Sequence, residues 1–207
     1  MRRLPLVLSA GLLVILPVSA GANPIPDLGN CTAVTAAAEP VSVYTLPDGS
    51  GDPLRACCAF GGDKIDASIT LQLLDWDFTP IPGVPAEDMW LESDGANFCP
   101  GGAIADGDTD PNGITTWRNA LAGGAASQPG AGTRVMVIGM SLPQPDLDIR
   151  FHSPDLDGDQ DVDLSDVVRF VQDFLGDYAW HSDFHWDGVL DLSDVVLMAQ
   201  GLERSCP

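Results

Sequence analysis

Basic residues are scarce in this chain of 207 residues, which has nine Lys and Arg against 30 Asp and Glu and a formal net charge of −21 at pH 7. Proteins that bind nucleic acids or anionic membranes use clusters of Lys and Arg to neutralise phosphate groups, and the sequence offers no such cluster. We therefore exclude both as partners. Two explanations of the acidity remain, which are the binding of cations and the maintenance of solubility.

Long apolar runs are absent after residue 22. The first residues, MRRLPLVLSAGLLVILPVSA, combine Arg2 and Arg3 with an apolar run over residues 4–18 and small residues that suit a cleavage site. This pattern predicts a signal peptide over residues 1–22 and a secreted or cell-surface protein, with an uncleaved membrane anchor as the alternative. Because no later run approaches the ~18 apolar residues of a membrane-spanning helix, we expect no membrane insertion after cleavage.

Motifs of common catalytic machinery are missing as well. The sequence contains no GxSxG and no cysteine near a general base. His181 and His185 lie four residues apart within HSDFH, which lacks the adjacent glutamate of zinc metalloproteases. Acidic pairs in the middle of the chain are explained by strand edges and turns, without the cleft that a glycosidase needs. The sequence therefore predicts no enzymatic activity, and a small hydrolase is a less favoured alternative.

Five cysteines are present, an odd number, and none belongs to the CxxC pairs typical of thiolate zinc sites. An exported protein meets an oxidising environment in which cysteines tend to pair, so at least one must stay free or pair between molecules. Cys57 and Cys58 should face opposite ways in an extended strand, which favours separate partners over a vicinal disulfide. The connectivity stays open for Cys31, Cys57, Cys58, Cys99 and Cys206.

Residues 23–153 alternate short apolar runs with clusters of Gly, Pro, Asp and Asn. The runs are rich in β-branched and aromatic residues and are bounded by turn formers, which is typical of strands, and no amphipathic helix stands out. The predicted fold class is therefore mainly β, with an antiparallel β-sandwich as its architecture. The predicted strands are residues 41–46, 67–76, 86–93, 114–121, 133–142 and 147–153.

Two turn sequences in this β-rich part resemble a known family. TPIPGVPAEDMWL contains a Pro-x-x-Gly-Val turn and TDPNGITTW a Thr-Asp-x-x-Gly turn, and each leads into a predicted strand. Together they resemble bacterial immunoglobulin-like domains of the invasin type. The resemblance covers residues 60–153 and implies an immunoglobulin-like sandwich, to which residues 23–59 can add the first strands. Asn112-Gly113 suits a tight turn because glycine tolerates a positive φ, whereas the glycine-rich stretch CPGGAIADGDTDPNG interrupts the pattern.

The remaining residues, 154–207, are rich in aspartate and contain an internal repeat. The hexapeptide DLSDVV occurs at residues 163–168 and again at 191–196, a period of 28 residues that indicates a duplicated supersecondary unit. Two twelve-residue segments, 155–166 and 183–194, place acidic residues at positions 1, 5, 9 and 12. This is the ligand spacing of an EF-hand-like loop, which wraps oxygen atoms around Ca²⁺. Apolar residues at helical spacing follow each loop and predict a helix.

A calcium loop followed by a helix, repeated once and with Asp instead of Glu at position 12, resembles the type I dockerin, by which cellulosomal enzymes bind cohesins. The resemblance covers residues 154 to about 204. It implies two Ca²⁺ ions, each held by aspartate side chains and by one backbone carbonyl at position 7. The implied ligands are Asp155, Asp157, Asp159, the carbonyl of Asp161, Asp163 and Asp166 in the first loop, and Asp183, Asp187, the carbonyl of Val189, Asp191 and Asp194 in the second.

Three features depart from the dockerin pattern. His185 stands at position 3 of the second loop, where a neutral imidazole is a poor Ca²⁺ ligand, so we expect weaker binding there. Gln160 stands at position 6 of the first loop, where a left-handed turn costs a side chain about 1 kcal/mol. Val171-Gln172 replaces a Lys-Arg pair that is common in dockerins and assists docking. The implied partner-binding residues, at positions 10 and 11, are Leu164, Ser165, Leu192 and Ser193.

Trp76, Trp90 and Trp117 fall on or beside predicted strands, where they can form a stacking platform for sugars or, as we favour, fill the core. The sequence thus predicts a secreted or cell-surface, non-catalytic calcium-binding protein that acts in extracellular assembly or adhesion, with a cohesin-like protein as partner. One alternative is a carbohydrate-binding module that a dockerin tethers to a polysaccharide-degrading complex. Another is an end domain stabilised by calcium without a cohesin partner.

Overall fold

The computed structural model describes residues 25–207, so the predicted signal peptide lies outside the described residues. This part of the chain is mainly β, which confirms the fold class predicted from the sequence. Neither of its α-helices has the length and apolar character needed to cross a membrane. The strands are β1 (Thr32–Thr35), β2 (Val41–Tyr44), β3 (Cys57–Ala59), β4 (Lys64–Ile65), β5 (Ile69–Gln72), β6 (Met89–Ser93), β7 (Asn97–Phe98), β8 (Ile114–Trp117), β9 (Gly123–Gly124), β10 (Thr133–Val137), β11 (Met140–Ser141) and β12 (Ile149–His152). The helices are α1 (Leu164–Leu175) and α2 (Leu192–Gly201), and the 3₁₀ turns are η1 (Leu54–Ala56), η2 (Ala86–Asp88) and η3 (Trp180–Ser182).

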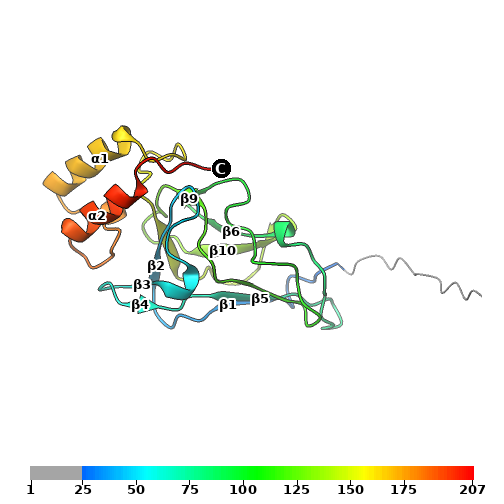
Figure 1. Ribbon diagram of the computed structural model, residues 1–207. Coiled ribbons are helices and arrows are strands. Elements are labelled where there is room, and N and C mark those ends of the chain that lie inside the picture. The colour runs from blue at the N-terminus through cyan, green and yellow to red at the C-terminus, as the bar shows by residue number, and fades with distance from the viewer. Residues whose placement is uncertain (1–24) are drawn as a thin grey trace, which may run out of the picture.

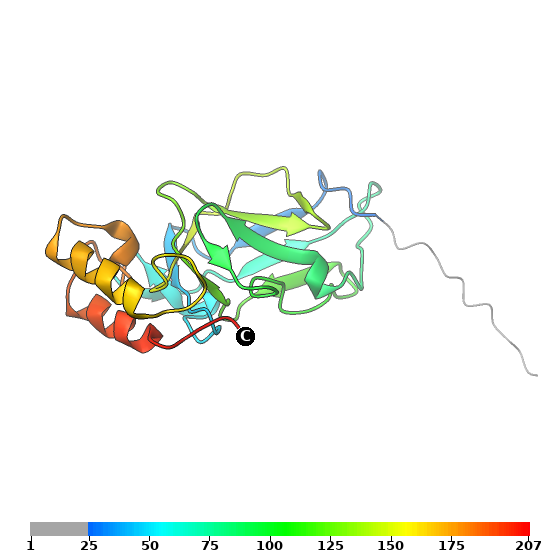
Figure 2. The ribbon, with the colours of Figure 1, turned by 90° about the horizontal axis from the view of Figure 1, so that it is seen from above.

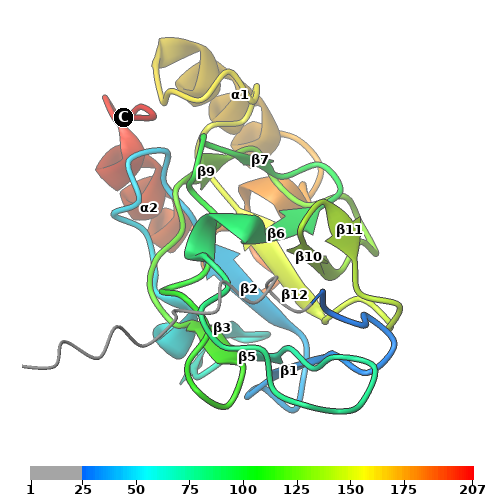
Figure 3. The same ribbon diagram turned by 90° about the vertical axis from the view of Figure 1, so that its right-hand side faces the viewer.

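The strands of the described residues form four small sheets, with the orders β1-β5-β8, β11-β10-β6, β12-β2-β3-β4 and β7-β9 (Figures 1 and 2). The prediction of a purely antiparallel arrangement is wrong for one pair, because β12 runs parallel to β2, with Ile149 opposite Val41 (Figure 3). Parallel neighbours need a long connection, and most of the β-rich part of the chain lies between these two strands. The β12–β2 pair therefore joins the two ends of that part.

Burial follows the pleat of the strands. In β5, β6 and β10 buried residues alternate with partly exposed ones, as expected for strands with one face toward a core. Trp117 is fully buried and its indole N–H donates to the carbonyl of Ala103 at 3.0 Å, so this tryptophan fills the core. Trp76 is exposed and Trp90 is partly exposed. The largest fully buried core side chains include Trp117, Phe151, Leu54, Ile69, Leu71, Leu73, Ile81, Met89, Leu91 and Ile149.

Each of the six predicted strands contains an observed strand, although most observed strands are shorter. The predicted tight turn at Asn112-Gly113 is also present. Gly113 has a φ of +70°, and a Cβ there would collide with the carbonyl of Leu73, so only glycine fits. Sequence reasoning missed β1, β3, β4, β7 and β9, because these pieces are short and carry little apolar alternation.

Both α-helices lie at one end of the β-rich part and pack against it through a second apolar cluster (Figures 1 and 2). Strand β2 has all four residues buried, because it serves both clusters. Val41 and Val43 belong to the main core, whereas Tyr44 belongs to the second cluster and donates its hydroxyl to the carbonyl of Leu197 at 2.7 Å. The buried members of this cluster are Tyr44, Leu46, Val162, Phe170, Phe184 and Met198.

His152, at the end of β12, lies at the junction between the β-rich part and the C-terminal helical part. Its ring is fully buried, bonds to the Ser42 hydroxyl through Nδ1, and packs edge-on against Trp180 with ring centroids 4.8 Å apart. Burial lowers the pKa of His152 to about 3, so the imidazole is neutral. This histidine is a structural residue of the junction.

Cys99 and Cys206 form a disulfide that ties the C-terminal tail to the β-rich part. Closing a loop of this length stabilises a fold by about 4 to 5 kcal/mol in the chain-entropy model. Cys31, Cys57 and Cys58 are buried free thiols. Cys57 and Cys58 therefore have neither the separate disulfide partners that the sequence favoured nor a vicinal disulfide, and burial raises the pKa of both thiols.

Replacing Phe184 with Ala should destabilise the protein by about 3 to 5 kcal/mol, because it empties the centre of the second apolar cluster. Phe184 is 1% exposed and its ring stacks on Phe170 at 5.6 Å. Urea denaturation measures the change. The matched control is Leu175→Ala, at an exposed position near the end of α1, which should cost less than about 1 kcal/mol. Equal losses for the two variants would contradict the packing described above.

Candidate metal centre

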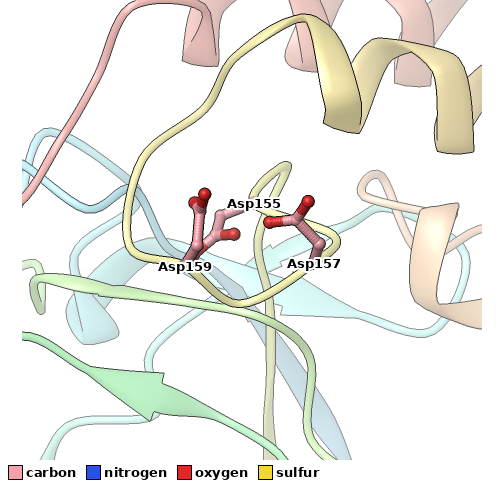
Figure 4. Close-up of side chains that lie close together, drawn as sticks. All are labelled: Asp155, Asp157 and Asp159. Atoms are coloured by element: carbon pink, nitrogen blue, oxygen red, sulfur yellow. The ribbon is translucent and has the colours of Figure 1, made fainter.

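The first aspartate-rich loop gathers three carboxylates on its inner side. Asp155, Asp157 and Asp159 each present an oxygen atom, and these atoms all lie within 4.8 Å of one another. Figure 4 shows the three side chains on the inside of the curved loop. Asp155 is fully buried, whereas the other two are more accessible. This cluster can hold a metal ion, and its ligand atoms are all oxygen.

The backbone of the loop curls because Asp155 holds it from within. Its Oδ1 accepts from the N–H of Gly158 at 2.8 Å and its Oδ2 from the N–H of Gln160 at 3.0 Å. Both donors lie in the left-handed region, with φ of +78° and +74°. The left-handed turn expected at position 6 is therefore present. The side-chain amide of Gln160 donates to Asn97 Oδ1 at 3.1 Å, and this hydrogen bond offsets the strain of the left-handed backbone at Gln160.

Asp163 and Asp166, also predicted as ligands, lie outside the three-carboxylate cluster. They cap α1 in a reciprocal capping box, in which each side chain accepts from the backbone N–H of the other residue, and Asp163 Oδ1 also accepts from Ser165 N–H at 2.6 Å. The buried Asp166 carboxylate accepts from three backbone N–H groups, those of Leu156, Asp157 and Asp163, at 2.7 to 3.1 Å. The Asp161 side chain is outside the cluster too, and the predicted ligand role of its backbone carbonyl stays a prediction.

The second loop repeats this hydrogen-bond pattern. Asp183 is fully buried and accepts from the N–H groups of Asp187 and Gly188, at 3.2 and 2.9 Å. Asp191 and Asp194 form the corresponding capping box at the start of α2, and Asp194 is also fully buried. Position 6 is here a glycine with φ of +89°, so it carries no strain. The internal repeat in the sequence thus corresponds to a repeat in structure.

The second loop differs in how its side chains meet. Its predicted ligands do not form a cluster like that of the first loop among the described residues. His185 at position 3 faces Asp187, with Nδ1 3.2 Å from Oδ2, and the buried Asp183 also accepts from the hydroxyl of Tyr178 at 2.7 Å. His181 bonds instead to Asp173 at 2.9 Å, so the two histidines do not converge on one site.

Electrostatic repulsion and burial both act on the first loop. Burial raises the pKa of Asp155 to about 6, and the nearby charges of Asp166 and Asp159 add to the effect. Burial likewise raises the pKa of Asp166 and of Asp194 in the second loop. The guanidinium of Arg169 lies 3.6 Å from Asp157 and is largely exposed to water. A cation in the loop would stabilise the ionised carboxylates at neutral pH.

The first loop is held from outside by segments that the sequence did not connect with it. The side chain of Asn97 in β7 donates to the carbonyl of Gly158 at 2.8 Å. The C-terminal tail pairs with the other end of the loop, where Cys206 N–H donates to the carbonyl of Gln160 at 3.0 Å. The Cys99–Cys206 disulfide joins these two supports. The tendency of cysteines to pair was the one signal in the sequence for these supports, and it did not reveal that Cys99 pairs with Cys206.

The predicted partner-binding residues lie at the start of the two helices. Leu164 and Leu192 are the first residues of α1 and α2, with 73% and 75% of their surface exposed. Ser165 and Ser193 follow and donate their backbone N–H groups to the capping aspartates. The two leucines therefore occupy equivalent, accessible places in the two repeats.

Comparison of the chain with protein-family models, with curated proteins and with solved structures finds no match. The donor atoms of the site therefore indicate which metals it suits. Carboxylate and carbonyl oxygens are hard ligands that suit Ca²⁺, Mg²⁺ or Mn²⁺ and disfavour soft metals.

In the absence of metal, the stability of the protein relative to the variant Asp155→Asn should fall as pH rises from about 4 to about 7. The native pKa of Asp155 lies above the unfolded value, so this carboxyl contributes most when protonated and its contribution is lost as pH passes about 6. Urea denaturation in chelator at several pH values measures the difference. His152 and other groups that do not interact with Asp155 titrate in both proteins and cancel. A difference that rises with pH would contradict the burial of this carboxyl.

Proposed function

We propose that the chain is an extracellular, non-catalytic calcium-binding protein whose first loop holds a Ca²⁺ ion. The observation that carries this proposal is the convergence of Asp155, Asp157 and Asp159 within 4.8 Å around a fully buried carboxylate. Ca²⁺ suits the loop because it accepts six to eight oxygen ligands in a flexible geometry. The twelve-residue spacing supports the same ion, with the Asp161 carbonyl, Asp163 and Asp166 completing the set.

A second, weaker Ca²⁺ ion is proposed for the second loop. The support is the shared backbone pattern, in which Asp183 and Asp194 take the places of the first and last acids of the first loop. Asp187, Asp191 and the Val189 carbonyl would supply the remaining oxygens. His185 replaces one oxygen ligand and holds Asp187, so the expected affinity is lower.

The docking role is proposed for the two helix starts. A dockerin-like module presents positions 10 and 11 of each loop to a cohesin-like partner, and the exposure of Leu164 and Leu192 supports this use. A cavity of about 720 Å³ beside Leu164, lined also by Val167 and Leu202, adds apolar surface to the first half. In this proposal the β-rich part, an immunoglobulin-like sandwich, is the unit that the module attaches to an extracellular assembly. The Cys99–Cys206 disulfide is compatible with an extracellular location.

Calcium titration by calorimetry tests the proposed metal site. Asp157→Asn and Asp159→Asn should each weaken the tighter site by about tenfold or more, because each removes a charged ligand. The matched control is Asp161→Asn, which removes a charge from the same loop but leaves the backbone carbonyl, and its affinity should stay within about threefold of the wild type.

Two results would refute the calcium proposal. The first is no binding heat for the full chain. The second is an equal loss for Asp161→Asn and Asp157→Asn, because that would show attraction to general negative charge without coordination.

The docking proposal predicts redundancy between the two helix starts. Binding to a panel of purified cohesin modules, measured by interferometry in calcium, should survive either Leu164→Arg or Leu192→Arg, because the other half can dock. The double variant should lose at least about tenfold in affinity. Leu175→Arg, at an exposed leucine near the other end of α1, is the control and should bind normally. Failure of the wild type to bind any cohesin would reject docking and leave the calcium proposal standing.

A further inference from the structure

The outer face of the β6–β10 pair carries polar and aromatic side chains away from the metal loops. Met89 and Leu91 of β6 are buried in the core, so Trp90 and Glu92 point to the other face. In the antiparallel register Arg134 of β10 lies directly opposite Glu92. An indole, a carboxylate and a guanidinium are therefore fixed next to one another on hydrogen-bonded strands.

These side chains line a cavity of about 450 Å³. Ile104 forms a bridge with Trp90 on the other edge of β6 and extends the apolar side of the cavity. Asp94 adds a second carboxylate, and Gly101 leaves open space because a Cβ there would meet nothing within 4 Å. The volume lies within the range of about 300 to 1,000 Å³ that is usual for sites of small ligands.

The polar groups of the cavity are held in place by one another. The indole N–H of Trp90 donates to Glu92 Oε1 at 2.9 Å, and Arg134 donates to Asp94 Oδ1 at 2.6 Å. Among the described residues, no partner bonds to the second oxygen of either carboxylate. The site therefore offers free acceptors, further N–H donors of Arg134, and the partly exposed indole of Trp90.

We propose that this cavity binds a neutral saccharide. A sugar ring has an apolar face of C–H groups that can pack on an indole, and a rim of hydroxyls that both donate and accept hydrogen bonds. Glu92 and Asp94 would accept from hydroxyls, and Arg134 would donate to them. This function goes beyond calcium binding and does not rest on it.

The charges of the cavity argue against other ligands. The two carboxylates outnumber the one guanidinium, so the cavity repels anions, as does the net charge of −21 on the chain. A metal ion would have to compete with Trp90 and Arg134, which already occupy one oxygen of each carboxylate. The cavity therefore suits a neutral ligand, because it offers hydrogen-bond donors, hydrogen-bond acceptors and an apolar surface together.

The test is retention of the full chain on insoluble cellulose, xylan, mannan and chitin, followed by calorimetry with soluble oligosaccharides of the retained polymer. Calorimetry distinguishes recognition of a sugar chain from adsorption to a solid surface. Trp90→Ala should weaken binding by about tenfold or more, the loss of one aromatic contact. Trp76→Ala is the matched control, because Trp76 is 74% exposed and lies outside the cavity, and it should bind like the wild type.

Glu92→Ala is a second variant, which spares the aromatic ring and keeps the test valid if Trp90→Ala fails to fold. It should also weaken binding severalfold. The experiment is repeated in chelator, where we expect saccharide binding to persist even if the calcium loops open. No retention on any neutral polysaccharide, stronger binding of an anionic one, or equal affinity of the wild type, Trp90→Ala and Glu92→Ala would each overturn the proposal.

Discussion

The buried Asp155 carboxylate, which lies beside Asp157 and Asp159, needs positive partners to be stable in its ionised form, because water no longer reaches it. Backbone N–H groups of the loop meet part of this need by donating to Asp155. We propose that a divalent cation meets the rest. The curled loop brings the carboxylate oxygens of Asp155, Asp157 and Asp159 together, while the capping of α1 and the C-terminal tail hold the loop in this shape.

The first loop and the β-rich part stabilise each other through direct contacts. Strand β12 leads directly into the loop, and its parallel partner β2 packs on the helices through Tyr44. Asn97 and the tail residue Cys206 support the loop from two sides, and the disulfide at Cys206 joins the supports. Binding of a cation should therefore strengthen the junction as well as the loop. The cavity on the outer face of β6 and β10 borders this network at Phe98 and Cys99, but the polar groups proposed to bind a saccharide, those of Glu92, Asp94 and Arg134, do not bond to the loop.

Local patterns in the sequence predicted local structure well. The apolar pattern after each loop predicted both helices, although they begin earlier, inside the loops, because Asp163 and Asp191 cap them; the left-handed turn at Gln160 was foreseen from the loop geometry. Contacts between distant segments were beyond such patterns. The parallel β12–β2 pair, the support from Asn97 and the choice of Cys99 for Cys206 depend on how the sheets close, which no short motif encodes.

We propose that oxygen atoms of the first loop surround a calcium ion. The most direct measurement is a crystal structure of the protein grown with calcium, with anomalous differences collected at long wavelength. The account predicts an anomalous peak between Asp155, Asp157 and Asp159, at about 2.3 to 2.6 Å from their oxygen atoms. An ordered first loop without a peak, in crystals saturated with calcium, would contradict it.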